Sequence, residues 1–182
     1  MARTPPQPAV DRMTPFAGSP IVVGVNPALA ALVPLTAASL AVAIGAPRLL
    51  FAYADPSRYV VEEHPDGTIR HAGVSPDALD DGWRAVEADL RQRLTTVLGE
   101  SSVPWEFRFL AGRPDRALTH LARAVDAAAI VVGTRAPGTG AHLREMLEGS
   151  VAMHLATHQH RPVLTVPLTV VDWKDTASAW DR

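Results

Sequence analysis

The most constraining feature of this chain is a long run without charge. No Asp, Glu, Lys or Arg occurs from Met13 to Pro47. Such a run is long enough to cross a bilayer, which takes about 20 apolar residues. Arg3 and Arg12 precede it, as they would in a signal anchor. A membrane-spanning helix is therefore the first possibility to consider.

Prolines divide this run into shorter pieces. Residues 21–25, Ile-Val-Val-Gly-Val, lie between Pro20 and Pro27 and have the β-branched pattern of a buried strand. Pro34 suits the first turn of a helix, and the Gly-Ala-Pro sequence at 45–47 is a helix stop. A strand followed by a helix accounts for the run without a membrane, and we favour this interpretation, with a membrane span as the alternative.

The predicted helix carries little polarity on any side. Between Leu35 and Ala46 its only polar side chains are Thr36 and Ser39, whereas a surface helix of a globular protein has a polar outer face. We therefore expect a second subunit, the segment 56–75 or the N-terminal arm to cover it.

Composition limits the classes of function. The chain has 182 residues, which suits one domain. Its 47% apolar and 20% charged residues exclude global disorder, and a net charge of −2 gives no electrostatic footprint for nucleic acid. The absence of cysteine excludes disulfides, iron–sulfur clusters and thiol nucleophiles.

Apolar runs and helical periodicity alternate along the rest of the chain. Strands are predicted at 20–26, 49–54, 105–109, 128–132 and 162–166, and helices at 33–45, from Ser75-Pro76 to Gly99, at 114–125 and at 149–158, with a short helical turn at 143–147. Because the strands are apolar at consecutive positions, both faces of their sheet should be covered. This pattern predicts one α/β, Rossmann-like three-layer domain with a five-stranded, mostly parallel sheet.

Three segments lie outside this alternation. Residues 56–75 flank Pro65-Asp66-Gly67 with two short extended runs, which predicts a hairpin after the second strand. Residues 1–18 are rich in proline and are expected to form a disordered arm. The domain itself is expected over 19–171, followed by a polar tail at 172–182.

The loops that follow the strands are the candidate ligand site, because ligands of such sheets bind at the carboxyl ends of the strands. Residues 133–140 form a Gly/Pro/Thr loop that leads to Gly149-Ser150 at a predicted helix start. Glycines and a helix N-terminus are able to hold phosphates. An ordinary turn followed by a serine N-cap explains the same residues equally well.

Several named motifs are absent. The chain has no G-x-x-x-x-G-K-[ST] and no G-x-S-x-G sequence, which excludes P-loop NTPases and argues against α/β-hydrolases. The Gly-x-Gly at 138–140 lacks a third glycine and follows the fourth strand, so a Rossmann dehydrogenase is disfavoured. No nucleophile, base and oxyanion site can be placed together as a catalytic set. His154, His158 and His160 suggest a metal site, but we favour a structural role for them near a helix C-terminus.

The sequence nevertheless resembles a known family. The order of the elements, Ile21–Val25, Gly112-Arg113-Pro114, the run 130–135 with Gly149-Ser150-Val151, and the run 161–166 are similar to UspA-type universal stress proteins. The likeness covers about residues 19–168. It implies a cytoplasmic homodimer, often paired through the last strand, that acts in the bacterial stress response, and in one branch of the family it implies bound ATP, with Mg²⁺ as a possible companion.

The resemblance also implies a set of nucleotide-binding residues. They are Gly24, Val25, Asn26, Tyr53, Gly133, Thr134, Arg135, Gly138, Gly140, Gly149, Ser150 and Val151. Two features depart from the family pattern: Asn26 stands where ATP binders usually carry Asp, and the spacing from Gly133 to Gly149 is longer than in the family motif. Three hypotheses therefore stand: a nucleotide-binding regulatory protein, a dimeric interaction module without nucleotide, and a slow ATPase. Neither nucleic acid nor a membrane is an expected partner.

Overall fold

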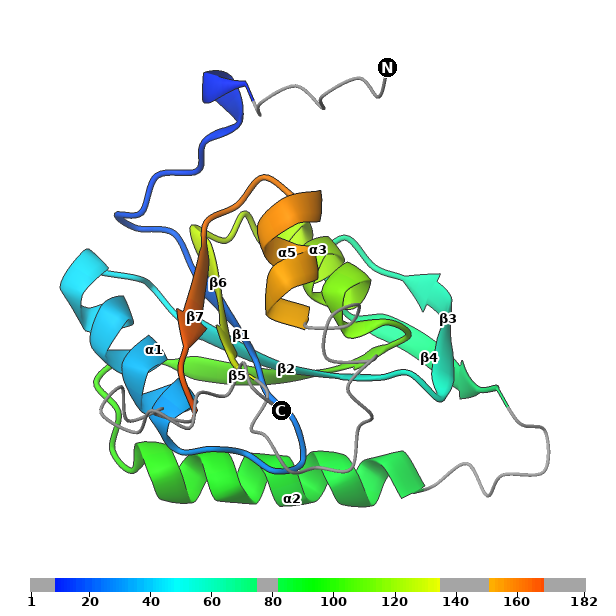
Figure 1. The fold of residues 1–182 in the computed structure, drawn as a ribbon. Helices are drawn as coiled ribbons and strands as arrows, with labels where there is room; N and C mark the ends of the chain where they lie inside the picture. Colours follow the sequence, from blue (N-terminus) through cyan, green and yellow to red (C-terminus); the bar gives the residue numbers. More distant parts are fainter. Residues whose placement is uncertain (1–8, 75–81, 135–150, 169–182) are drawn as a thin grey trace, which may run out of the picture.

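The centre of the structure is one sheet of five parallel strands. A computed structural model describes residues 9–74, 82–134 and 151–168 (Figure 1). The sheet has the order β5-β2-β1-β6-β7, and every neighbouring pair is parallel. Its strands are β1 (Ile21–Gly24), β2 (Leu49–Asp55), β5 (Trp105–Ala111), β6 (Ala129–Gly133) and β7 (Val163–Val166). The predicted sheet is confirmed, with strand ends that differ by a few residues from those expected.

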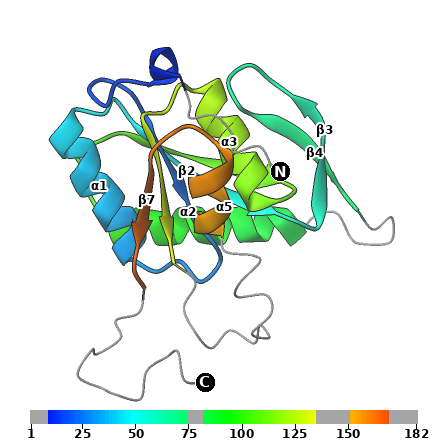
Figure 2. The same ribbon diagram turned by 45° about the horizontal axis from the view of Figure 1, so that its top comes forward.

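Helices cover both faces of the sheet. The helices α1 (Leu32–Ile44) and α2 (Gly82–Leu98) lie on one face, and α3 (Pro114–Ala124) and α5 (Val151–His158) lie on the other (Figures 1 and 2). Along β1, Ile21 and Val23 join the core under α1 and α2, whereas Val22 joins the core under α3 and α5. This two-sided burial explains why the strands are apolar at consecutive positions.

The charge-free run folds into β1 and α1. Gly45 ends the helix with φ +62°, a left-handed conformation that glycine adopts without steric cost, and its N–H donates to carbonyls of the last turn. Within the part of the chain that the structure describes, no helix is long and apolar enough to cross a membrane. The interpretation as a strand plus a helix is therefore confirmed.

The outer face of α1 is open in the single chain. Val33, Ala37 and Ala41 are buried against the sheet, while Leu32, Leu35 and Val42 are 52%, 48% and 60% exposed. The expectation that the segment 56–75 covers this helix is wrong, because that segment packs at the opposite edge of the sheet, beside β5 (Figure 1). Residues 9–19 of the arm leave these side chains exposed as well. Cover by a second subunit stays a prediction.

The segment after β2 is a hairpin, as predicted. Its strands are β3 (Arg58–Glu63) and β4 (Ile69–Gly73), which pair antiparallel. In the turn, the Asp66 Oδ1 atom accepts hydrogen bonds from the N–H and hydroxyl of Thr68, at 3.0 and 2.7 Å. Gly67 follows with φ +78°, where a residue with a Cβ would be strained.

Aromatic side chains fix the hairpin on α2. Trp83 and Phe109 contact the His71 ring edge-on and tilted, with centroids 4.7 and 5.1 Å away. The buried Arg58 donates from Nε to His71 Nδ1 at 2.7 Å. Asp55 also acts structurally at the base of the hairpin, because its Oδ1 accepts from Ser57 N at 2.9 Å. The Asp-Pro sequence after β2 is therefore a turn.

The start of the described chain contacts the segment that leads into β7. A short 3₁₀ helix, η1 (Val10–Arg12), precedes Thr14, whose hydroxyl accepts a hydrogen bond from Arg161 at 2.5 Å. Arg161 is 7% exposed and also donates to the Ala127 carbonyl. A buried guanidinium needs such acceptors, and the arm supplies one of them.

Candidate functional site

A cavity lies where the sheet changes direction. From β1 the sheet order continues to β2 and β5 on one side and to β6 and β7 on the other, so β1 and β6 flank the switch point. The cavity has a volume of about 190 Å³ at the carboxyl ends of these strands. Its lining comprises Gly24, Val25, Asn26, Ala52, Tyr53, Ala54, Pro114, Leu118, Val132, Gly133, Thr134 and Val151.

Seven of these lining residues are predicted site residues. They are Gly24, Val25, Asn26, Tyr53, Gly133, Thr134 and Val151, which lie on β1, β2, β6 and α5 or directly after β1 and β6. The remaining predicted residues, Arg135, Gly138, Gly140, Gly149 and Ser150, lie outside the described residues. The short turn predicted at 143–147 lies outside them too.

Gly24 allows α3 to pack closely at the base of the cavity. A Cβ at this position would lie 2.9 Å from Leu118 Cδ1 and 3.0 Å from Val132 Cγ1. These distances are shorter than normal carbon contacts, so a larger residue here would require the Leu118 and Val132 side chains to shift. The same packing places Leu118 as one wall of the cavity.

Asn26 uses its side-chain oxygen inside the protein. The Oδ1 atom accepts hydrogen bonds from Ala28 N at 3.0 Å and from Leu29 N at 3.2 Å, closing a turn directly after β1. An aspartate would close the same turn through one of its oxygens. What differs is the second polar atom, since Asn presents the donor Nδ2 where Asp presents an acceptor.

Tyr53 lines the cavity near the end of β2, but its ring points to the other face of the sheet. The ring contacts Phe109 edge-on with centroids 5.5 Å apart and belongs to the core under α1 and α2. Burial and the neighbouring Asp55 charge raise the pKa of the Tyr53 phenol. The neighbours Ala52 and Ala54 belong to the core of the opposite face, so we expect the Tyr53 backbone, and not its ring, to face a ligand.

Gly133 and Thr134 connect the cavity to the last strand. A Cβ on Gly133 would lie 2.9 Å from Leu168 Cδ1 and 3.0 Å from Val33 Cγ2. The Thr134 N–H donates to the Val166 carbonyl, and its hydroxyl oxygen accepts from Leu168 N, both at 2.8 Å. The Thr134 hydroxyl hydrogen has no acceptor among the residues that the structure describes, so it is able to donate to a ligand.

The helix α5 approaches the cavity at its first residue. Val151 lines the cavity at the N-terminal end of this helix. The N-terminal end of a helix carries partial positive charge and N–H groups without intrahelical acceptors, both of which favour an anion. This part of the cavity therefore suits phosphate better than the apolar part does.

Sequence reasoning missed the apolar lining. Ala52, Ala54, Leu118 and Val132 carry no polar group, and in the sequence they look like ordinary core residues. Pro114 was available as a signal, since it opens α3 directly after Gly112-Arg113. Apolar walls with a few polar groups are nonetheless the usual composition of a small-molecule site.

The histidines of α5 form a stacked pair. The His154 and His158 rings have centroids 5.5 Å apart, and His158 Nδ1 lies 3.2 Å from the His154 carbonyl. Among the residues described here, no group of three or more His, Cys, Asp or Glu side chains is arranged to hold a metal ion.

The five parallel strands define a doubly wound α/β domain, and its cavity lies at the switch point, the place where ligands of such sheets bind. The sequence matches the model of the universal stress protein family over residues 19–167, and the chain belongs to that family.

Solved structures share the fold. A universal stress protein in complex with cAMP is 24% identical, with a TM-score of 0.55, and the match covers 84% of this chain and 99% of that one. A universal stress protein from Archaeoglobus fulgidus in complex with dAMP is 22% identical, with a TM-score of 0.55 and coverage of 81% and 97%. One from Burkholderia pseudomallei is 22% identical, with a TM-score of 0.52 and coverage of 82% and 96%. No protein with a curated description matches the chain.

Proposed function

We propose that this protein binds an adenine nucleotide, ATP above all, in the cavity at the switch point. The observation that carries the proposal is the convergence of Gly24, Val25, Asn26, Tyr53, Gly133, Thr134 and Val151 on that one cavity. Two structures of similar fold contain cAMP and dAMP, which supports the adenine nucleotide as the class of ligand.

The cavity has a part suited to each part of a nucleotide. The small side chains of Ala52 and Ala54 leave room for a flat base beside Leu118. Asn26 Nδ2 and the Thr134 hydroxyl donate to the base or the ribose. The N-terminal end of α5 at Val151 faces the phosphates. We propose that Arg135, Gly138, Gly140, Gly149 and Ser150 complete the phosphate site, with Mg²⁺ as a companion of ATP.

The role that follows is regulatory binding. In this proposal the protein is cytoplasmic, acts in the bacterial stress response and responds to the level of an adenine nucleotide. Such a role requires affinity for the nucleotide and a change in the protein when it binds, but no hydrolysis of the nucleotide. We propose that the active form is a homodimer. The strand β7 is an edge of the sheet, and Leu164 on it is 38% exposed, so this edge is available for pairing with a second copy.

The first test identifies the ligand without assuming it. Mass spectrometry of small molecules released from the purified full chain is expected to show an adenine nucleotide. Isothermal titration calorimetry with ATP, AMP and cAMP, with and without Mg²⁺, then ranks them. A chain that carries no nucleotide and binds none of the three would leave the dimeric interaction module as the better account.

A matched pair of variants places the ligand. Ala54→Leu adds bulk at the cavity wall and is expected to abolish nucleotide binding. Ala85→Leu makes the same change on the exposed face of α2 and is expected to leave binding unchanged. If both variants bind ATP like the parent chain, the nucleotide site lies elsewhere.

A further inference from the structure

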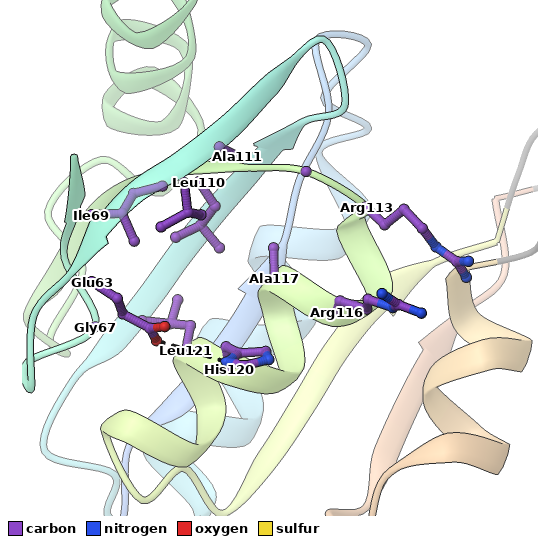
Figure 3. Close-up of a pocket in the computed structure, with 12 residues that line it drawn as sticks. Glu63, Gly67, Ile69, Leu110, Ala111, Arg113, Arg116, Ala117, His120 and Leu121 are labelled. Atoms are coloured by element: carbon purple, nitrogen blue, oxygen red, sulfur yellow. Dashed lines mark ion pairs between the residues drawn. The ribbon is translucent and has the colours of Figure 1, made fainter. Parts of the chain in front are cut away.

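A second cavity lies between the β3–β4 hairpin and α3. Its volume is about 290 Å³, larger than that of the switch-point cavity, and it approaches the range of roughly 300–1,000 Å³ typical of small-molecule sites. Val60 and Ile69 line it from the hairpin, Leu110 from β5, and Ala117 and Leu121 from α3. Figure 3 shows Ile69, Leu110, Ala117 and Leu121 around this space.

The hairpin and the helix hold this cavity together at two points. A Cβ on Gly67 would lie 2.7 Å from Leu121 Cδ1, so the hairpin turn rests directly on α3. Glu63 on β3 lies 3.8 Å from His120 on the same helix (Figure 3). The apolar space is therefore a cleft between two elements that contact each other, open to solvent on one side.

The charges at the cavity favour an anion. Arg113 is neutralised by Asp115, at 2.9 Å. Glu63 is the only acidic residue among the described residues of the lining, and it lies 3.8 Å from His120, on the side of that ring away from Arg116 (Figure 3). Arg116 is exposed and forms no ion pair with any residue in the described ranges. An apolar interior with the Arg116 guanidinium at its rim, unpaired among the residues that the structure describes, fits a monoanion that carries a hydrocarbon body.

We propose that this cavity binds a small amphipathic carboxylate, with the hydrocarbon part between Ile69, Leu110 and Leu121 and the carboxylate on Arg116. The Arg116 guanidinium is able to supply the two parallel N–H donors that a carboxylate accepts, and the single negative charge of a carboxylate matches its single positive charge. A protein with this site responds to a second class of metabolite.

The site is independent of the nucleotide cavity. The helix α3 separates the two, because Pro114 and Leu118 line the switch-point cavity while Ala117 and Leu121 line the hairpin cavity. A carboxylate and a nucleotide are therefore expected to bind without competition, and the failure of one site leaves the other unaffected.

The test uses hexanoate, octanoate and 1-octanol as probes of the full chain in isothermal titration calorimetry. Each added methylene is expected to raise affinity about fourfold while space remains. Octanoate is expected to bind at least about tenfold more tightly than octanol, because only the carboxylate pairs with Arg116. Saturating ATP is expected to leave the octanoate affinity unchanged.

Variants assign the two ends of the ligand. Arg116→Gln is expected to remove the preference for octanoate over octanol. Arg123→Gln removes an exposed arginine on the same helix that does not line the cavity, and is expected to change nothing. Ala117→Phe is expected to abolish binding of both probes by filling the cavity, and Ala117→Leu is the milder variant if the first unfolds.

The proposal is overturned if octanoate does not bind, if it binds no better than octanol, or if ATP displaces it. Equal loss of octanoate binding in Arg116→Gln and Arg123→Gln would also overturn it, because that result would show only a general attraction to positive charge.

Discussion

Arg93 on α2 donates a hydrogen bond from Nη1 to the Pro27 carbonyl at 2.5 Å, and so connects a helix to the loop that follows β1. Its Nη2 donates to the Ala28 carbonyl at 2.9 Å. The same loop holds Asn26, whose side chain closes the turn at the edge of the switch-point cavity. Arg93 therefore holds the loop of a residue that lines the cavity, without lining the cavity itself.

Arg93→Ala is expected to destabilise the chain by about 1.5 kcal/mol, because two carbonyls lose a charged donor. Nucleotide affinity should also fall, because the loop after β1 that holds Asn26 loses its two hydrogen bonds to Arg93. This fall should be larger than partial unfolding of the chain would produce. Chemical denaturation and calorimetric titration with ATP measure the two effects. Asp89→Asn is the control, because it removes only the carboxylate that lies 3.3 Å from Arg93 Nη1. An equal loss of affinity in both variants would contradict the role of the carbonyl contacts.

The two functions of the Asn26 side chain can be separated by substitution. Asn26→Ala removes the acceptor that closes the turn, and is expected to cost about 1 kcal/mol of stability as well as nucleotide affinity. Asn26→Asp keeps the acceptor, so it should retain the parent stability. Because our proposal has Nδ2 donate to the nucleotide, this variant should bind ATP more weakly, even though the resemblance places Asp here in the ATP binders of the family. Thermal denaturation and titration with ATP provide the comparison. If Asn26→Asp binds like the parent chain, the residue serves the turn alone.

Gly133→Ala tests whether glycine is required by packing at the end of β6. The added Cβ would lie 2.9 Å from Leu168 and 3.0 Å from Val33, and overpacking of this kind costs about 1–3 kcal/mol. Gly82→Ala is the matched control, because a Cβ there has no neighbour within 4 Å and the residue begins α2. The control should be neutral or slightly stabilising in urea denaturation. A loss of stability in both variants, or in neither, would show that close packing is not the reason for glycine at 133.

The fold could be predicted because its signals are local. The strands are read from consecutive apolar residues, the hairpin from Pro65-Asp66-Gly67, and the end of α1 from Gly45. The candidate site residues, such as Asn26, were predicted from the resemblance to the family, because the residues alone fit an ordinary turn equally well. The apolar wall of the cavity carries no such mark, because Ala54 and Leu118 resemble any core residue until α3 is placed against β2.

Contacts between residues that are far apart in the chain could not be predicted from the sequence. Nothing near Arg93 indicates that it reaches Pro27, and nothing near Gly67 indicates that it rests on Leu121. The hairpin cavity depends on the second of these contacts, so its existence follows from packing and not from a motif. The exposed face of α1 is the opposite case. Its lack of charge could be seen in the sequence, but neither the sequence nor the single chain identifies a surface that covers it.

The hairpin turn should respond to acid. Hydrogen bonds from the Thr68 hydroxyl and N–H lower the pKa of Asp66 from its usual 3.8. A carboxyl whose pKa is lower in the folded state adds stability above its unfolded pKa, and this stability is lost as the pH falls through the folded pKa. Asp66→Asn is therefore expected to be less stable than the parent chain at pH 7, with the difference shrinking at pH 3. Denaturant titrations at both pH values test this, and a difference that stays constant would assign the loss to geometry and not to charge.

The proposed homodimer makes a last prediction about two apolar surfaces. Leu164 lies on the edge strand β7, and Leu35 lies on the exposed face of α1, a helix that packs beside β7. A lysine at either position would place a charge in the interface if the dimer covers both, so Leu164→Lys and Leu35→Lys are each expected to shift the chain toward monomer in sedimentation velocity. Met153→Lys, on the helix α5 of the opposite face, is 62% exposed and should leave the assembly unchanged. Dissociation by Leu164→Lys alone would confine the interface to the strand edge and leave α1 without cover, whereas dissociation by Met153→Lys would place the interface on the other face of the sheet.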